Sequence, residues 1–146
     1  MTQENQLEQT TIKNNLTIQE LIGGPTPKEH VKQREGSFGM VFDYVEPGYV
    51  ISKLNAAFGG AWSFETELVA TETLKGGHII VKGRLTVGQT VREQFGSAQL
   101  KMTKEEPRRV VGEVGDSVKM AASDALKKCA SLYGLALDVY SGGQYE

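Results

Sequence analysis

The chain has almost no cysteine and no hydrophobic run long enough to cross a membrane. Its single cysteine, Cys129, excludes an intramolecular disulfide and fits a reducing compartment. No apolar run approaches the roughly 20 residues that a bilayer-spanning helix needs. The first residues also lack the basic region and apolar core of a secretory signal. We therefore expect a cytoplasmic protein that makes no membrane contact.

The sequence is also poor in the side chains that catalysis and metal binding use. His30 and His78 have no cysteine or carboxylate at metal-ligand spacing, and neither a CxxC nor an HExxH motif occurs. Cys129 falls on the apolar stripe of a predicted helix, which favours a buried small side chain over a nucleophile. The stretch GRLTVGQT at 83–90 has the glycine spacing of a phosphate-binding loop, but Gln89 replaces the essential lysine. These absences predict that the protein is not an enzyme and uses no metal or other cofactor.

A length of 146 residues suits a single domain with its own core. Residues 1–15 are polar and are expected to form a disordered tail, residues 16–141 form the domain, and residues 142–146 are a short C-terminal tail. Hydrophobic spacing predicts a helix at 16–22, a strand at 36–45 and a helix beginning at Pro47 and ending before Gly59-Gly60.

Three further strands are predicted in the middle of the chain. The first covers about 61–73, with Glu65 and Glu67 on its outer face, and ends at a Gly76-Gly77 turn. The second alternates inward apolar residues with outward His78, Lys82 and Arg84, and Gly88-Gln89 leads into a third strand at 90–100. A charged loop at 101–115 follows. This order indicates an α+β fold with an antiparallel sheet of three to four strands.

The segment 116–134, DSVKMAASDALKKCASLYG, is the most strongly periodic part of the chain. Asp116 is placed to cap this helix, and Gly134 lies where a helix C-terminal glycine belongs. One apolar stripe is formed by Val118, Ala121, Ala122, Ala125, Leu126, Cys129, Leu132 and Tyr133. We expect this long helix to pack on the sheet, followed by a short tail that contains Tyr140.

Positive charge is concentrated in the second half of the chain. Residues 1–74 carry a balance of −5, whereas residues 75–128 carry +5. The long helix supplies Lys119, Lys127 and Lys128, the loop before it supplies Lys101, Lys104, Arg108 and Arg109, the sheet supplies Lys82, Arg84 and Arg92, and Arg34 precedes the first strand. Such a set could bind phosphates. The alternative is an ordinary solvated face with an Asp124–Lys128 pair at i,i+4 spacing.

A small sheet also leaves two unpaired edges. Strand pairing between subunits would cover them and would make the protein a homo-oligomer. An edge covered by the N-terminal segment is an equal alternative.

Three blocks within residues 34–140 resemble the annealing domain of the Rad52/Rad22 family of double-strand break repair proteins. The first runs from Arg34 through Tyr44-Val45-Glu46 and the helix 50–58 to the FGGAW stretch at 58–62. The second is REQFG at 92–96, and the third is KMAASDALKKCASLYG at 119–134. The blocks occur in the family's order and with similar spacing.

The resemblance implies a β-β-β-α core that assembles into a closed or partly open ring. Single-stranded DNA would lie in a basic groove with its bases exposed, and complementary strands would be annealed without ATP in homologous recombination and repair of DNA damage. Arg34 matches a phosphate-contacting arginine, Lys127-Lys128 match a basic pair and Lys119 matches a basic position. A bacterial or phage protein associated with the nucleoid is implied, with a recombinase or single-strand-binding protein as a further partner.

The sequence departs from the family pattern at three places. The Val87-Gly88 turn lacks a lysine that some members have, which puts a second, outer DNA site in doubt. Gly96-Ser97-Ala98 replaces a Gly-aromatic-Gly stretch, and we expect no long tail for a protein partner after the helix. Two other functions remain open: a protein that protects single strands or DNA ends without annealing them, and, less favoured, a small metal-dependent nuclease that uses acids such as Glu65 or Glu93.

Overall fold

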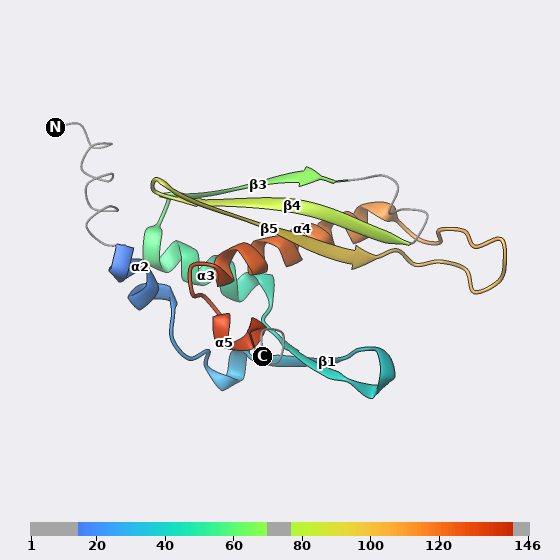
Figure 1. The fold of residues 1–146 in the computed structure, drawn as a ribbon, viewed down its shortest axis with the longest axis horizontal. Helices are drawn as coiled ribbons and strands as arrows, with labels where there is room; N and C mark the ends of the chain where they lie inside the picture. The colour runs from blue at the N-terminus through green and yellow to red at the C-terminus, as the bar shows by residue number, and fades with distance from the viewer. Residues whose placement is uncertain (1–14, 70–76, 142–146) are drawn as a thin grey trace.

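The computed structural model describes residues 15–69 and 77–141. The expected tails at 1–15 and 142–146 therefore lie almost entirely outside the described residues, as do Gly76 and the predicted strand end at 70–73. The elements in chain order are α2 (Asn15–Ile22), η1 (Lys28–His30), β1 (Lys32–Glu35), η2 (Ser37–Gly39), β2 (Val41–Tyr44), α3 (Pro47–Phe58), β3 (Trp62–Leu68), β4 (His78–Val87), β5 (Thr90–Gln99), α4 (Val114–Ser131) and α5 (Leu137–Tyr140) (Figure 1).

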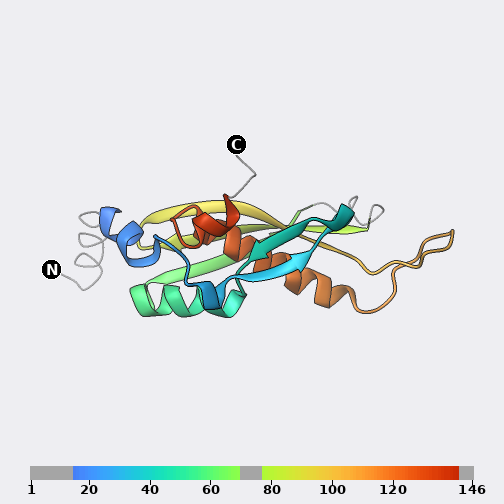
Figure 2. The same ribbon diagram turned by 90° about the horizontal axis from the view of Figure 1, so that it is seen from below.

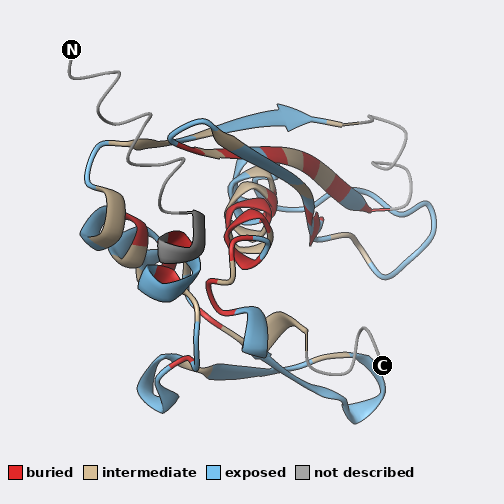
Figure 3. Ribbon diagram, turned by 60° about the vertical axis from the view of Figure 1, so that its left-hand side comes forward, coloured by how far each residue is buried: buried red, intermediate tan, exposed pale blue. Residues whose placement is uncertain are grey.

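The fold is α+β and has two separate antiparallel sheets. Strands β3, β4 and β5 form the larger sheet in that order, and β1 pairs only with β2. Helix α4 lies between the larger sheet and the β1–β2 hairpin, with α5 beside its C-terminal end (Figure 3). The predicted α+β class, antiparallel sheet and packed long helix are confirmed.

The alternation predicted for β4 is also confirmed. Residues at the odd positions from 79 to 87 are buried and those at 78 and 84 are exposed (Figure 3). Glu65 lies opposite Arg84 and Glu67 opposite Lys82. The inner face of the sheet thus packs on α4, and the outer face of β3 and β4 carries Glu65, Glu67, Lys82 and Arg84.

The predicted strand at 36–45 is wrong in its extent. Only Val41–Tyr44 forms a strand, and the chain reverses through Phe38 (φ 62°) and Gly39 (φ 72°) to pair with β1. Left-handed backbone at two successive residues forms a tight hairpin turn, which the alternation of apolar residues could not reveal. Two consequences follow: no fourth strand joins the larger sheet in the described part of the chain, and Arg34 lies within β1 instead of before the first strand.

Helix α4 begins earlier than predicted. Glu113, in extended conformation, precedes its first turn, and Asp116 lies inside that turn instead of capping it. Gly115 lies in that first turn, and the entropic cost of a glycine, about 1 kcal/mol in a helix interior, is too small to keep the helix from starting there. The C-terminal end is as predicted: Leu135 N–H donates to Ala130 O (3.2 Å) and Gly134 N–H to Ser131 O (2.9 Å), the two bonds of a Schellman motif, with Gly134 at φ 103°.

The apolar stripe of α4 is confirmed except at one position. Ala121, Ala125 and Cys129 are fully buried, whereas Leu132 is 45% exposed. Leu132 falls where the last helical turn tightens, since its N–H donates to Cys129 O three residues back. This change of pitch turns its side chain away from the core.

The segment predicted as a tail contains the short helix α5, which ties the two ends of the domain together. Asp138 accepts hydrogen bonds from the Thr26 N–H (2.9 Å) and the Thr26 hydroxyl (2.7 Å). The Tyr140 hydroxyl accepts from the Val45 N–H at 3.2 Å. These contacts fix the segment around Thr26 and the end of β2 against α5.

Asp138→Asn is expected to lower stability by about 1 kcal/mol at neutral pH, because a neutral amide makes the weaker acceptor for Thr26. Burial alone would raise the pKa of Asp138, but the hydrogen bonds from Thr26 outweigh it and hold this pKa below 3.8. A lowered pKa in the folded state stabilises the protein above pH 3.8, and this stabilisation is lost as the pH falls through the folded pKa. In thermal melts between pH 3 and 7, the melting temperatures of the wild type and the Asp138→Asn variant should therefore approach each other toward pH 3. A constant difference across that range would contradict the assignment.

Strands β3 and β5 are the two edges of the larger sheet, and no other strand of residues 15–69 or 77–141 pairs with either. Pairing between subunits is not tested by one chain, and residues 1–14 of the N-terminal segment lie outside the described residues.

Candidate nucleic-acid interface

Lys127 and Lys128 lie in the C-terminal half of α4, on the side that faces the β1–β2 hairpin and α5. Both side chains are half-buried, and each ends over an aromatic ring. The Lys127 Nζ is 5.5 Å from the centroid of Tyr44 in β2, and the Lys128 Nζ is 3.9 Å from that of Tyr140 in α5. The electron-rich ring faces attract the ammonium groups, so two flexible side chains are held in defined places.

Arg34 reaches the same region from β1. Register places Arg34 opposite Phe42 and Lys32 opposite Tyr44, and residues directly opposite in an antiparallel pair share a face. The guanidinium lies 5.7 Å from the Phe42 ring centroid. The face of the hairpin that carries Arg34 is therefore the face whose Tyr44 ring holds Lys127.

The charge of Arg34 also acts on both lysines. Burial lowers the pKa of Lys127 and of Lys128; Asp124 partly offsets this, and the positive charge of Arg34 lowers both values further. Asp124 also accepts a hydrogen bond from the Ser97 N–H at 3.0 Å. We call Arg34, Lys127 and Lys128 the cation cluster. Its members repel one another, so an incoming anion would relieve an existing cost.

The predicted Asp124–Lys128 ion pair is not formed. Among the described residues, the ion pairs within 4.0 Å are those of Lys82 and Arg84 with Glu93. The Asp124 carboxylate instead points to the edge strand β5, where it accepts from the Ser97 backbone. The alternative of an ordinary paired surface therefore does not describe this part of α4.

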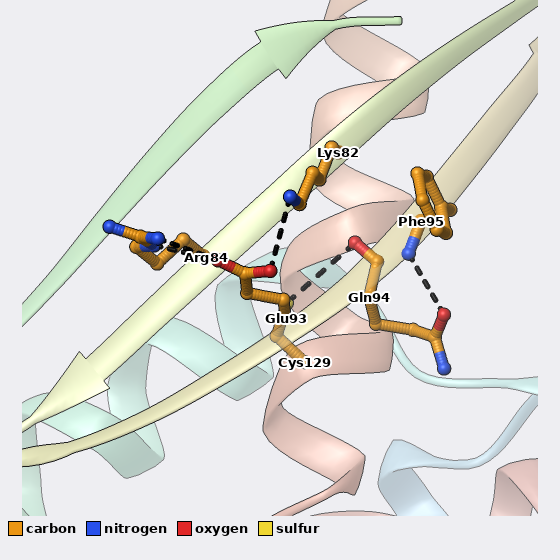
Figure 4. A network of polar contacts seen from close by, with 6 residues as sticks. All are labelled: Lys82, Arg84, Glu93, Gln94, Phe95 and Cys129. Atoms are coloured by element: carbon orange, nitrogen blue, oxygen red, sulfur yellow. Dashed lines mark hydrogen bonds and ion pairs between the residues drawn. The ribbon is translucent and has the colours of Figure 1, made fainter.

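The cations of the sheet are engaged within the protein. Lys82 Nζ lies 3.1 Å and Arg84 Nη2 2.8 Å from the Glu93 carboxylate (Figure 4). These hydrogen bonds, with Arg84 the stronger, lower the pKa of Glu93. Arg92 lies on the other face, 5.1 Å from the Tyr133 ring centroid. Glu93, held between two cations, is poorly placed to serve as a metal ligand.

Cys129 is fully buried, as predicted. Its thiol contacts Gln94 O at 3.9 Å, and burial raises its pKa (Figure 4). A protonated, enclosed thiol is a poor nucleophile.

The structure separates the remaining predicted site residues from the cation cluster. Lys119 is exposed on α4, eight residues before Lys127. The loop carries four exposed cations in a narrow ribbon that projects from the far end of the molecule (Figures 1 and 2): Lys101, Lys104, Arg108 and Arg109. Thr103 N–H donates to Arg109 O at 2.8 Å, and Val111 N–H to Lys101 O at 2.8 Å, which holds the ribbon together.

Two absences among the described residues bear on other functions. Residues 15–69 and 77–141 contain no group of three or more His, Cys, Asp or Glu side chains that could hold a metal ion. No helix in the same part of the chain combines the length and the hydropathy of a bilayer-spanning segment.

Sequence reasoning missed the aromatic side chains of the site. Tyr44 and Tyr140 lie 96 positions apart, and neither has helical or strand spacing to the lysines it supports. The signal that was present is the pair of adjacent lysines on a helix otherwise rich in alanine, which marked their position but not their aromatic support.

Comparison with known proteins identifies the family of the chain. Residues 14–145 match the family described as "Rad52/22 family double-strand break repair protein". The single-stranded DNA-binding protein DdrA of Deinococcus deserti is 33% identical over 129 residues, which cover 84% of this chain and 56% of the relative. DdrA of Deinococcus radiodurans is 30% identical over 129 residues, 84% of this chain and 54% of the relative. The chain spans about half the length of these relatives. It belongs to the Rad52/22 family of double-strand break repair proteins.

Proposed function

We propose that this protein binds single-stranded DNA through the cation cluster and anneals complementary strands without ATP during double-strand break repair. The observation that carries the proposal is geometric: Arg34 shares a hairpin face with Tyr44, and the Tyr44 ring holds Lys127, next to Lys128 on α4. Arg34 and the two lysines are more than 90 residues apart in the chain. Three cations held on rigid elements, with rings beneath them, suit a flexible polyanion.

The relatives support the same proposal. Both DdrA proteins carry single-stranded DNA binding in their names. This chain covers only about half of each relative, so single-stranded DNA binding is a proposal for this chain.

The physical mechanism needs charge and preorganisation and no bond-breaking step. Phosphates held by the cluster would fix the strand along the hairpin and α4, leaving its bases free to pair. Neutralising the backbone lowers the repulsion between two strands, and several subunits in a ring would hold many nucleotides at once. We propose that residues 16–141 form this annealing domain, that Lys119 and the loop cations extend the contact, and that the protein acts in the cytoplasm as a homo-oligomer, with a recombinase or single-strand-binding protein as a further partner.

The protein is expected to bind single-stranded oligonucleotides with an affinity that falls steeply as salt rises. Each phosphate contact should contribute about 0.7 to the slope of log K against log salt, because binding releases condensed counterions. Fluorescence anisotropy at several salt concentrations measures this slope. An affinity independent of salt would contradict binding through the cluster.

Annealing is tested separately from binding, with two labelled complementary strands mixed with and without protein and with and without magnesium. Annealing predicts faster pairing that needs neither ATP nor magnesium. Binding without faster pairing would favour the alternative of strand or end protection. Strand cleavage that requires magnesium would favour a nuclease, which the pairing of Glu93 with Lys82 and Arg84 opposes.

A further inference from the structure

A hollow of about 470 Å³ opens beside the β1–β2 hairpin, at the start of α3. Its volume falls within the range of about 300–1,000 Å³ that small-molecule sites occupy. The side chains around it that bear on binding are His30, Lys32, Glu46, Tyr49 and Lys53. None of them was singled out as a binding residue from the sequence.

An aromatic stack forms one wall of the hollow. The rings of His30, in η1, and Tyr49, in the first turn of α3, lie 4.5 Å apart at an angle of 24°. Tyr49 is half-buried against the core, whereas His30 is exposed. The core thus holds Tyr49 in place, and the stack presents an aromatic surface to solvent on which a planar ring can stack.

Two lysines line the same hollow from different elements. Lys32 comes from β1 and Lys53 from the middle of α3, and Glu46 is the one carboxylate among the lining residues. Positive charge therefore lies at the end of the hollow where Lys32 and Lys53 meet. The pKa of Tyr49 is raised, first by burial and then by the carboxylates of Asp138 and Glu29. Negative charge therefore lies near the Tyr49 hydroxyl. A phosphate would be favoured at the lysine end.

Lys32 links the hollow to the hairpin face that carries Arg34. Lys32 lies two residues before Arg34 in β1, so both side chains share the hairpin face, about 7 Å apart along the strand. Lys32 lies opposite Tyr44, the residue whose ring holds Lys127. A line of positive charge thus runs from α4 across the hairpin to α3.

We propose that this hollow binds one further nucleotide of the strand held by the cation cluster, with its base stacked on the His30–Tyr49 pair and its phosphate between Lys32 and Lys53. The inference rests on the proposed function and adds a base contact to a site otherwise made of phosphate contacts. Stacking tolerates any base, so the hollow would hold the strand in place without imposing a sequence.

The test compares a variant of the hollow with a matched lysine variant elsewhere. His30→Ala combined with Lys53→Ala should weaken binding of a single-stranded oligonucleotide about tenfold and reduce the salt slope by about 0.7, through one lost stacking and one lost phosphate contact. His30 is exposed and Lys53 half-buried, so the fold should be retained, which circular dichroism checks. Lys82→Ala, on the outer face of the sheet, should bind within about twofold of the wild type, because its charge is already paired with Glu93.

Crosslinking gives a second, direct measurement. An oligonucleotide that contains 5-iodouracil should crosslink on irradiation to His30 or Tyr49, as identified by mass spectrometry of peptides. Unchanged binding by the double variant, or crosslinks only at other positions, would overturn the inference. If Arg34→Ala still weakened binding in that case, the proposed function would stand without the hollow. A wild-type protein that does not bind single strands would overturn both.

Discussion

Gly96→Ala is expected to destabilise the protein by about 3 kcal/mol, because the site has no room for a methyl group. A Cβ at Gly96 would overlap the backbone N of Ala125 and the backbone O of Ala121, and would lie 2.8 Å from the Ala125 Cα. These are backbone atoms of α4, which cannot rotate away as a side chain can. The helix would have to move off the sheet, and the inner face of β4 and β5 would lose its packing.

Gly115→Ala is the matched control for this substitution. Gly115 lies in the first turn of the same helix, and a Cβ there would have no neighbour within 4 Å. Alanine should leave stability unchanged or raise it by up to about 1 kcal/mol, since it is the better helix former. Thermal and urea melts compare the two. Equal melting temperatures would show that β5 and α4 are not in close contact.

This contact also positions the cation cluster. Ala125 is two residues before Lys127, so the helix turn that lies on Gly96 is the turn that directs the lysines toward the hairpin. Gly96 belongs to the REQFG block that resembles the family, and the structure gives the physical reason for a glycine there.

The parts of the fold that follow from local pattern could be predicted from the sequence. The strict alternation of β4, Pro47 at the start of α3 and the alanine-rich stripe of α4 each reflect one buried face with a regular period. The β1–β2 hairpin could not be predicted, because its turn depends on left-handed backbone at Phe38, a residue type that seldom adopts it. Helix α5 could not be predicted either, since it is held by distant partners, Thr26 and Val45.

The candidate site shows the same division. The lysine pair was visible as adjacent cations on a predicted helix, and Arg34 was visible only through the family resemblance. The Tyr44 and Tyr140 rings that support the lysines, and the His30–Tyr49 stack, depend on how distant segments pack. The four loop cations were predicted to belong to the same surface from their charge. Charge alone does not show the direction in which a loop projects, so the sequence could not separate them from the cation cluster.

Arg34→Ala combined with Lys127→Met and Lys128→Met is expected to weaken binding of single-stranded DNA about 100-fold or more. Three charge-assisted phosphate contacts at roughly 1 kcal/mol each give this loss. The salt slope should fall by about 2, since about 0.7 is lost per contact. Methionine keeps most of the length and packing of lysine, so the change is mainly one of charge. Lys127→Arg with Lys128→Arg keeps the charge, and this control should bind nearly as well as the wild type.

The substitutions of Lys127 and Lys128 by methionine should weaken DNA binding without lowering the stability of the protein. Burial lowers the pKa of Lys127 and Lys128 below the ordinary value of 10.5, so the folded state favours their charged form less than the unfolded chain does. Each ammonium therefore costs stability at neutral pH, and this cost fades as the pH rises through the folded pKa toward 10.5. The methionine variants should melt at the same temperature as the wild type or higher while they lose DNA binding. A lower melting temperature with unchanged affinity would show that the two lysines serve the fold and not the strand.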